Sequence, residues 1–193
     1  VSITPESAKN IINLGIQVQI EKGYAEHIGL SDSLYKDNGV QIKNSSKEIM
    51  ETSDLLLKVE CPNSDEINLM KKNLILVGIF NPSKNESRLK EILKKEIKVF
   101  SLELLPRITR AQSMDVLSSQ SNLAGYRAVV DSVAEFEKAV PMMMTAAGTV
   151  PAAKVLVIGA GVAGLQAIAT AKRLGAIVSA TDVRAASKEQ VES

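Results

Sequence analysis

The chain is poor in aromatic residues and nearly balanced in charge. Of its 193 residues only three are Phe and three are Tyr, none is Trp, and the formal net charge is +1. Proteins that bind single-stranded nucleic acid stack bases on aromatic rings and follow the phosphates with clustered positive charge. Because Lys and Arg are spread along this chain rather than gathered in runs, we expect no nucleic-acid partner.

Cysteine and histidine occur once each, as Cys61 and His27. A single cysteine excludes a disulfide framework within the chain and fits a reducing compartment. One cysteine and one histidine are too few for a metal-ligand cluster of the usual spacing, so we expect no metal site. Cys61, beside Pro62, is expected to be a small packed residue, and His27 a loop residue.

The chain also lacks a secretory signal and an apolar run of about 18 residues, the length that crosses a membrane. The nearest candidate, residues 139–153, is uncharged but is interrupted by Pro141, Gly148 and Pro151. A strand pattern follows it directly. We therefore expect a buried connection between two parts of the fold.

A glycine-rich turn between an apolar run and a helical pattern is the clearest positive signal. The run 155–158 is typical of a buried strand, residues 165–174 have one apolar helical face, and residues 176–181 form a second strand pattern ending at Asp182. The glycines of the turn are Gly159, Gly161 and Gly164. This order is the dinucleotide-binding fingerprint in its full structural context. The glycines allow a tight turn, close approach of a pyrophosphate and close packing of helix on strand, and the helix N-terminus attracts the phosphates.

Asp182 indicates which dinucleotide binds. A carboxylate at the end of the second strand accepts hydrogen bonds from the hydroxyls of the adenosine ribose. The same negative charge would repel a 2′-phosphate at that position. The fingerprint therefore predicts NAD(H) rather than NADP(H) as the cofactor.

Helix and strand patterns alternate from residue 1 to 111, which predicts a mainly parallel sheet covered on both faces. A long helical pattern over 112–138 is expected to join this domain to a second one, and 139–193 is expected to begin the dinucleotide-binding domain. The predicted fold class is α/β, with two Rossmann-like parallel-sheet domains joined by a long helix. The second is truncated, because a dinucleotide fold needs more strands. We also expect the first strand of the N-terminal domain to precede Val1.

The segment 106–127, between the two predicted domains, is too polar for a simple connection. Gln112, Asp115 and Ser118 are spaced three apart, so in a helix they would share one face. A Gln amide can both donate to and accept from a carboxamide, and Arg107 can pair with an acid. Taken alone, the segment reads better as a capped, solvated helix start. Its expected place at the mouth of an interdomain cleft favours ligand binding instead.

Three stretches together resemble one known family. They are residues 106–120, residues 141–151 and the fingerprint ending at Arg184. They are similar to the NAD(H)-binding domain of the alpha subunit of proton-translocating NAD(P) transhydrogenases, and residues 1–6 and 55–59 also match the wider alanine dehydrogenase/transhydrogenase superfamily. The resemblance covers essentially the whole chain.

This resemblance implies two Rossmann-like domains with a cleft between them, NAD(H) on the second, and a homodimer. It implies that the intact enzyme, an oxidoreductase and translocase, also contains a membrane-spanning proton-conducting domain and a separate NADP(H)-binding domain. The chain would then lie on the cytoplasmic face of a bacterial inner membrane, or on the matrix side in mitochondria, attached through that complex. By itself it would be inactive.

Matching the motifs residue by residue assigns the family's roles to this chain. The resemblance implies that four residues orient the nicotinamide where hydride is transferred: Arg107, Gln112, Asp115 and Ser118. The implied cofactor contacts further include Ser113, Met114, Gly159, Ala160, Gly161, Val162, Gly164, Asp182, Val183 and Arg184. Ala160, Gly161 and Val162 would approach the pyrophosphate, and the last three residues would surround the adenosine ribose. Because hydride passes directly between two nicotinamides, these side chains orient the reactants and do not act as acid or base.

An alanine dehydrogenase-like amino-acid dehydrogenase is the main alternative. Lys58 matches the substrate-binding lysine of that relative, but its catalytic histidine has no counterpart in residues 76–81. Oxidative deamination needs a proton acceptor, so the missing histidine argues against this activity and leaves Lys58 as a structural or relict residue. A nucleotide-sensing domain without chemistry is a third possibility.

Overall fold

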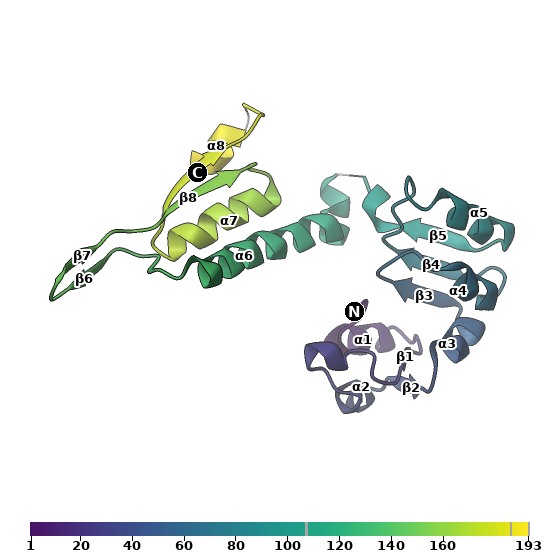
Figure 1. Ribbon diagram of the computed structural model, residues 1–193. Coiled ribbons are helices and arrows are strands. Elements are labelled where there is room, and N and C mark those ends of the chain that lie inside the picture. Colours follow the sequence, from purple (N-terminus) through teal and green to yellow (C-terminus); the bar gives the residue numbers. More distant parts are fainter. Residues whose placement is uncertain (107, 186, 193) are drawn as a thin grey trace. The chain divides into compact units, whose positions relative to one another are not determined.

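The computed structural model describes residues 1–106, 108–185 and 187–192 (Figure 1). Two compact units are present, Val1–Met114 and Asp115–Ser193. Both contain parallel strands connected through helices. The α/β class and its parallel sheets are therefore confirmed.

Helices and strands alternate in the first unit. In chain order its elements are α1 (Pro5–Ile12), β1 (Gln19–Glu21), the 3₁₀ helix η1 (Glu26–Ile28), α2 (Asp32–Asp37), β2 (Gln41–Lys43), α3 (Ser46–Thr52), β3 (Leu55–Lys58), α4 (Ser64–Leu69), β4 (Ile75–Gly78), α5 (Glu86–Lys94), β5 (Lys98–Ser101) and the 3₁₀ helices η2 (Leu102–Leu104) and η3 (Thr109–Met114). Strand β1 pairs with β2, and β3, β4 and β5 form a second parallel sheet in that order. Parallel pairing follows because each pair is separated by a helix that returns the chain to the same end of the sheet.

Local side-chain chemistry sets several helix starts in this unit. Thr4 and Ser7 form a capping box at α1, and Asn63 and Glu66 form another at α4. Such reciprocal bonds satisfy N–H groups that have no partner inside the helix. Helix α5 begins at Glu86, after the chain has turned through Asn81 at a φ of 45°.

Two apolar clusters hold the first unit together. One lies around β3, β4 and α5 and includes the fully buried Leu74, Leu76 and Phe80. The other lies around α1 and β1, where the buried Tyr35 donates its hydroxyl to the carbonyl of Ile3 at 2.9 Å. Tyr35 thus buries a large ring without leaving its polar end unpaired.

The second unit contains the longest helix and the glycine turn. Its elements are α6 (Val116–Phe136), β6 (Met143–Thr145), β7 (Gly148–Val150), β8 (Lys154–Ile158), α7 (Val162–Arg173), β9 (Ile177–Thr181) and α8 (Ser187–Glu192). Strands β8 and β9 are parallel and hydrogen-bonded along their full length, with α7 connecting them. Helix α6 packs on α7, and a Cβ added at Gly125 would clash with the carbonyl of Ala163. Gly125 therefore permits a very close approach of the two helices.

The long helix is shorter at its start than the predicted range 112–138. It begins at Val116, because the side chain of Asp115 accepts the N–H of Ser118 and so caps the helix. Gln112 lies before this cap, in the 3₁₀ helix η3. The prediction that Gln112, Asp115 and Ser118 share one face of an α-helix is therefore wrong.

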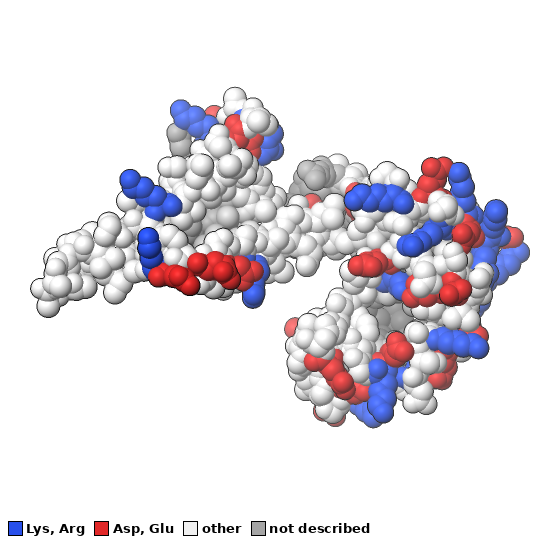
Figure 2. All heavy atoms as spheres, in the orientation of Figure 1, with Lys and Arg blue, Asp and Glu red and all other residues white. Residues whose placement is uncertain are grey.

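The prediction of a buried connection over 139–153 is also wrong. Strands β6 and β7 pair with each other in an antiparallel hairpin, and every residue of both strands is exposed, Met144 by 80%. Gly148, at a φ of 125°, permits the turn between them, and Thr145 donates its hydroxyl to the Gly148 carbonyl at 2.8 Å. In Figure 2 the hairpin carries no charged atoms, in agreement with the sequence. Within the described part of the chain, no helix is both long and apolar enough to cross a membrane.

Candidate nucleotide-binding site

The turn after β8 requires glycine at its first position. Gly159 has a φ of 95°, a conformation that L side chains rarely adopt, and its N–H donates to the carbonyl of Thr181 at 2.7 Å. This bond joins the end of β8 to the end of β9. The turn therefore leaves the sheet beside the residue that follows β9, which is Asp182.

The other two glycines meet different constraints. A Cβ at Gly164 would clash with the carbonyl oxygen of Gly159, so this glycine allows α7 to start directly against the strand end. A Cβ at Gly161 would meet only the Nη2 atom of Arg184, at 3.9 Å. The outer surface of the turn is therefore open at Gly161.

Helix α7 begins at Val162 with Gly161 as its N-cap, and no side chain caps it. The first N–H groups of an α-helix have no partner within the helix, and they carry the positive end of its dipole. A phosphate beside Gly161 would satisfy them. The Ala160 N–H is different, because it donates to Asp182. Gly161 and Val162 therefore lie at the uncapped start of α7, whereas the Ala160 N–H already has a partner in Asp182.

Asp182 accepts four hydrogen bonds. Its Oδ2 atom accepts the Ala160 N–H at 2.7 Å and Nη2 of Arg184 at 3.0 Å. Its Oδ1 atom accepts the backbone N–H of Arg184 at 2.8 Å and Nε of the same residue at 3.0 Å. The side-chain bonds from Arg184, followed by the backbone bonds, hold the pKa of this carboxyl well below its usual range. Asp182 is therefore a fixed anion at the edge of the turn.

The two residues after Asp182 face outward. The Val183 side chain is fully exposed, and that of Arg184 is 60% exposed. The structure thus brings together Gly159, Gly161 and Asp182–Arg184 at one end of the β8–β9 sheet. This is the end where the carboxyl termini of parallel strands leave a crevice for a ligand.

The second predicted group is only partly brought together. Ser118 donates its N–H to Oδ1 of Asp115 at 2.9 Å and its hydroxyl to Oδ2 at 2.6 Å. Gln112, Ser113 and Met114 are exposed residues of η3, at the end of the first unit. Arg107 lies outside the described residues.

Lys58 takes part in a structural ion pair. Its ammonium lies 2.5 Å from Oε1 of Glu66, and the side chains of the two residues are only 22% and 25% exposed. Glu66 also accepts the Asn63 N–H and so helps to cap α4. Lys58 therefore anchors a helix start. After β4 the chain places Phe80 and Asn81, whose N–H groups both donate to Glu103.

The single cysteine and the single histidine both lie in the first unit. Cys61 packs against the apolar cluster of the first unit, as expected, and burial raises the pKa of its thiol. His27 is exposed on η1, a single turn of 3₁₀ helix where a loop was expected. Among residues 1–106, 108–185 and 187–192, no three His, Cys, Asp or Glu side chains gather as metal ligands would.

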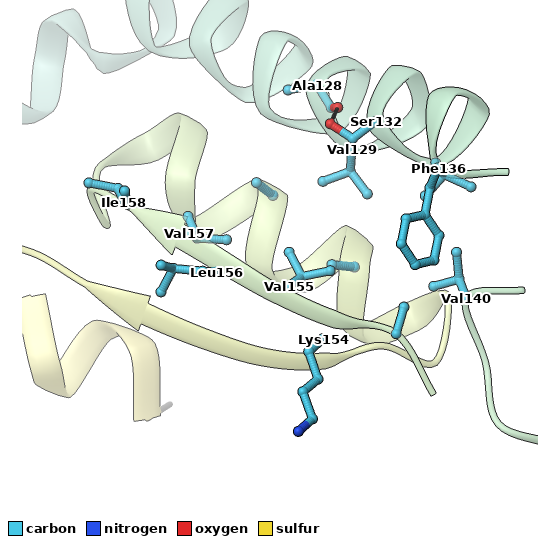
Figure 3. A pocket seen from close by; sticks show the side chains of 14 residues that line it. Ala128, Val129, Ser132, Phe136, Val140, Lys154, Val155, Leu156, Val157 and Ile158 are labelled. Atoms are coloured by element: carbon cyan, nitrogen blue, oxygen red, sulfur yellow. Dashed lines mark hydrogen bonds between the residues drawn. The ribbon is translucent and has the colours of Figure 1, made fainter. Parts of the chain in front are cut away.

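An apolar cavity of about 320 Å³ lies within the second unit (Figure 3). Its walls come from α6, β8 and α7, and include Val129, Phe136 and Val155. The Ser132 hydroxyl already donates a hydrogen bond to the Ala128 carbonyl, at 2.7 Å. A dinucleotide site needs polar groups that converge on the ligand. The walls of this cavity offer too few, so the candidate site is the turn and not this cavity.

Sequence reasoning missed two features of the site. The first is the pairing of Arg184 with Asp182, for which the only signal is an acid and a base two residues apart. The second is the contact of Gly125 with Ala163, for which an isolated glycine in a helical pattern was the available signal.

Parallel strands joined by a glycine turn and a helix, with an acid after the second strand, define a Rossmann-like nucleotide-binding fold. Comparison with family models gives two matches, to "Alanine dehydrogenase/PNT, N-terminal domain" over residues 1–124 and to "Alanine dehydrogenase/PNT, C-terminal domain" over residues 128–193. The chain belongs to the alanine dehydrogenase/PNT family.

Several curated relatives match over the full chain. The chain is 50% identical to an NAD(P) transhydrogenase alpha subunit of Rhodospirillum rubrum and covers 52% of that relative's length. It is 49% identical to the protein of the same name from Rickettsia prowazekii, of which it covers 51%. An alanine dehydrogenase of Methanococcus maripaludis is 28% identical over 95% of this chain and 49% of its own length. The chain thus spans about half the length of these relatives.

Two solved structures share the fold. The transhydrogenase from Sinorhizobium meliloti matches all of this chain and 57% of its own, with a TM-score of 0.94 and 50% identity. An L-alanine dehydrogenase matches all of this chain and 53% of its own, with a TM-score of 0.81 and 23% identity. The second likeness shows the fold alone.

Proposed function

We propose that this chain is the NAD(H)-binding component of an NAD(P) transhydrogenase, in which hydride passes between NAD(H) and an NADP(H) held on a partner domain. One observation carries the proposal: the open glycine turn lies beside the fixed carboxylate of Asp182. The identity of 43 to 50% to transhydrogenase alpha subunits over the whole chain supports it. Bound NAD(H) supplies the hydride, and the chain binds and orients it.

The residues of the turn fit a dinucleotide. Gly161 and Val162 present N–H groups at the start of α7 to the pyrophosphate. Asp182 accepts the ribose hydroxyls, and its charge disfavours a 2′-phosphate. Val183 and Arg184 flank the adenosine, and Gly159 and Gly164 shape the turn.

The nicotinamide end is assigned to the segment before and at the start of α6. Gln112, Asp115 and Ser118, with Arg107, would orient the ring, and Ser113 and Met114 would contact it. The Asp115–Ser118 pair supports this role, because Ser118 donates its N–H and its hydroxyl to the Asp115 carboxylate and so fixes the positions of both side chains. A fixed pair can hold a carboxamide in one orientation, which is what direct hydride transfer requires.

We further propose that the complete enzyme is a homodimer containing a proton-conducting membrane domain and an NADP(H)-binding domain. This chain would then be peripheral, on the cytoplasmic or matrix side of the membrane. The 193-residue chain alone would not catalyse the reaction, because the second nicotinamide is held elsewhere.

Separating binding from transfer in the full-length polypeptide tests the proposal. Gln112→Ala and Asp115→Ala should reduce hydride transfer to NADP⁺ much more than NADH binding, because binding rests mainly on the turn. Asp115→Asn, which keeps the helix cap, controls for loss of structure. Lys58→Met, at the structural ion pair, should leave both quantities nearly unchanged. Equal loss of binding and transfer, or loss of neither, would contradict the assigned role.

An alanine dehydrogenase activity is the second candidate, because relatives of that name match most of the chain. The geometry disfavours it: Lys58 is held by Glu66, and Phe80 and Asn81 follow β4, where a histidine would be needed. NADH oxidation that depends on pyruvate and ammonia would establish this activity. NADH binding by a complete complex that transfers no hydride would instead indicate a nucleotide sensor.

A further inference from the structure

Arg184 forms a two-pronged ion pair with Asp182. Nε lies 3.0 Å from Oδ1, and Nη2 lies 3.0 Å from Oδ2. The Ala160 and Arg184 backbone N–H groups donate to the same two oxygens. An ionised carboxyl offers about four acceptor positions, so this one is fully used.

A ribose bound through its 2′- and 3′-hydroxyls needs two of these acceptor positions. The backbone N–H groups belong to the turn and to the chain after β9, so releasing them would move the main chain. The guanidinium bonds can be released by rotating one side chain. Arg184 is also the solvent-facing partner, 60% exposed against 9% for Asp182. The guanidinium is therefore the group that a ribose would replace.

The guanidinium also lies beside the phosphate-binding surface. Its Nη2 atom is the nearest atom to a Cβ placed on Gly161, at 3.9 Å. Gly161 is the N-cap of α7, where the helix can accept a phosphate. A guanidinium matches phosphate oxygens as well as it matches a carboxylate, through two parallel hydrogen bonds. A phosphate at Gly161 would thus lie within a short side-chain movement of Arg184.

We propose that Arg184 exchanges partners on binding: the ribose hydroxyls replace it on Asp182, and it then pairs with the phosphate of the same ligand. This exchange would make Arg184 a specificity-determining residue for adenine nucleotides that carry both a free ribose diol and a phosphate. A nucleoside would have to displace the guanidinium and would offer it no new partner. The inference rests on the proposed binding of NAD(H) at the glycine turn.

Comparing two ligands with the full-length polypeptide tests the exchange. Adenosine carries the diol without a phosphate, and NADH carries both. In Arg184→Ala, adenosine should bind about two- to fivefold more tightly, because its competitor for Asp182 is gone. NADH should bind by a similar factor more weakly, because losing the phosphate pair outweighs removal of the same competitor. Arg173→Ala removes the same charge at the exposed far end of α7 and should change neither affinity.

A spectroscopic readout follows the guanidinium directly. The Nε–H signal of Arg184 in ¹⁵N-labelled protein should shift on addition of adenosine, as the bond to Asp182 is released. Isothermal titration calorimetry gives the affinities of the same samples. An unchanged Nε–H signal at saturation would mean that the ion pair persists and would overturn the exchange.

The outcomes separate the exchange from the proposed function. If Arg184→Ala weakens adenosine and NADH in parallel, or alters neither, Arg184 only supports the turn and the exchange is overturned. If the affinities shift in opposite directions while the complete complex transfers no hydride, the exchange stands and the transhydrogenase proposal fails. Absence of NADH binding by the unmodified protein would overturn both.

Discussion

Ser118 donates two hydrogen bonds to Asp115, one from its backbone N–H and one from its hydroxyl, and these bonds set the first turn of α6. Two residues assigned to the nicotinamide therefore also determine where the longest helix begins. A substitution at either position acts on structure as well as on ligand binding. Any loss of activity has to be separated from a loss of helix stability.

Asp115→Ala should lower the free energy of unfolding by about 1 kcal/mol, the usual effect of losing an N-cap side chain. Asp115→Asn should lower it far less, because an amide oxygen can accept the same backbone N–H. Urea unfolding followed by circular dichroism measures both. Equal destabilisation by the two substitutions would show that the cap contributes little.

Gly164→Ala and Gly161→Ala should separate packing from binding. The first places a methyl group against the Gly159 carbonyl and should cost about 1–3 kcal/mol of stability, as overpacking does. The second meets no close atom and should change stability by less than about 0.5 kcal/mol. It should nevertheless weaken NADH binding, because the methyl group would occupy the surface proposed to bind the pyrophosphate. Thermal unfolding and NADH titration of both variants are the measurements, and a stable Gly164→Ala protein would contradict the assignment.

Lys95, the residue that follows helix α5, caps the C-terminal end of helix α4. Its ammonium donates to the carbonyls of Ile67, Asn68 and Met70 at 2.8, 2.7 and 2.7 Å. Lys95→Met should cost about 1–3 kcal/mol, because partly buried carbonyls lose a charged donor. Lys94→Met, at the exposed adjacent position, should have almost no effect. Chemical denaturation of the two variants side by side tests this, and equal midpoints would refute it.

Stability should depend on pH through Glu103. Burial alone raises the pKa of this carboxyl, but hydrogen bonds from backbone N–H groups, including those of Phe80 and Asn81, outweigh burial and lower it. A lowered folded-state pKa stabilises the protein above the unfolded value of about 4.3, and this contribution is lost as the pH falls through the folded value. The stability difference between the unmodified protein and Glu103→Gln should therefore be largest near pH 7 and shrink towards pH 3. Urea titrations across this range measure it; Glu51→Gln, at an exposed pair, is the control, and a difference independent of pH would contradict the prediction.

Much of the fold follows from local patterns. The glycine turn, the strands on either side of it and the acid after β9 all lie close to the positions that spacing predicted, because each is fixed by short-range sterics. The start of α6 was misplaced because Gln112, Ser113 and Met114 are compatible with a helix, and one side-chain bond from Asp115 decides the boundary. Such a bond does not alter the spacing of apolar residues, so the sequence pattern does not indicate where the helix begins.

Burial was harder to predict than secondary structure. Residues 139–153 are apolar, yet β6 and β7 are exposed, since burial depends on which other segments pack against a strand. The same limit applies to the site. The position of Asp182 indicated a ribose acceptor, but the four bonds that use its oxygens became visible only in three dimensions.

The close contact of Gly125 with Ala163 also fixes which side of α6 faces α7. Ser118 precedes Gly125 by about two helical turns, so both lie on nearly the same side of α6, roughly 10 Å apart along its axis. Ala163 lies in the first turn of α7, next to the glycine turn. Insertion of one residue between Ser118 and Gly125 would rotate the start of α6 by about 100° about its axis. In the proposed binding mode, the number of residues between Ser118 and Gly125 would therefore set the distance and angle between the two ends of a bound dinucleotide.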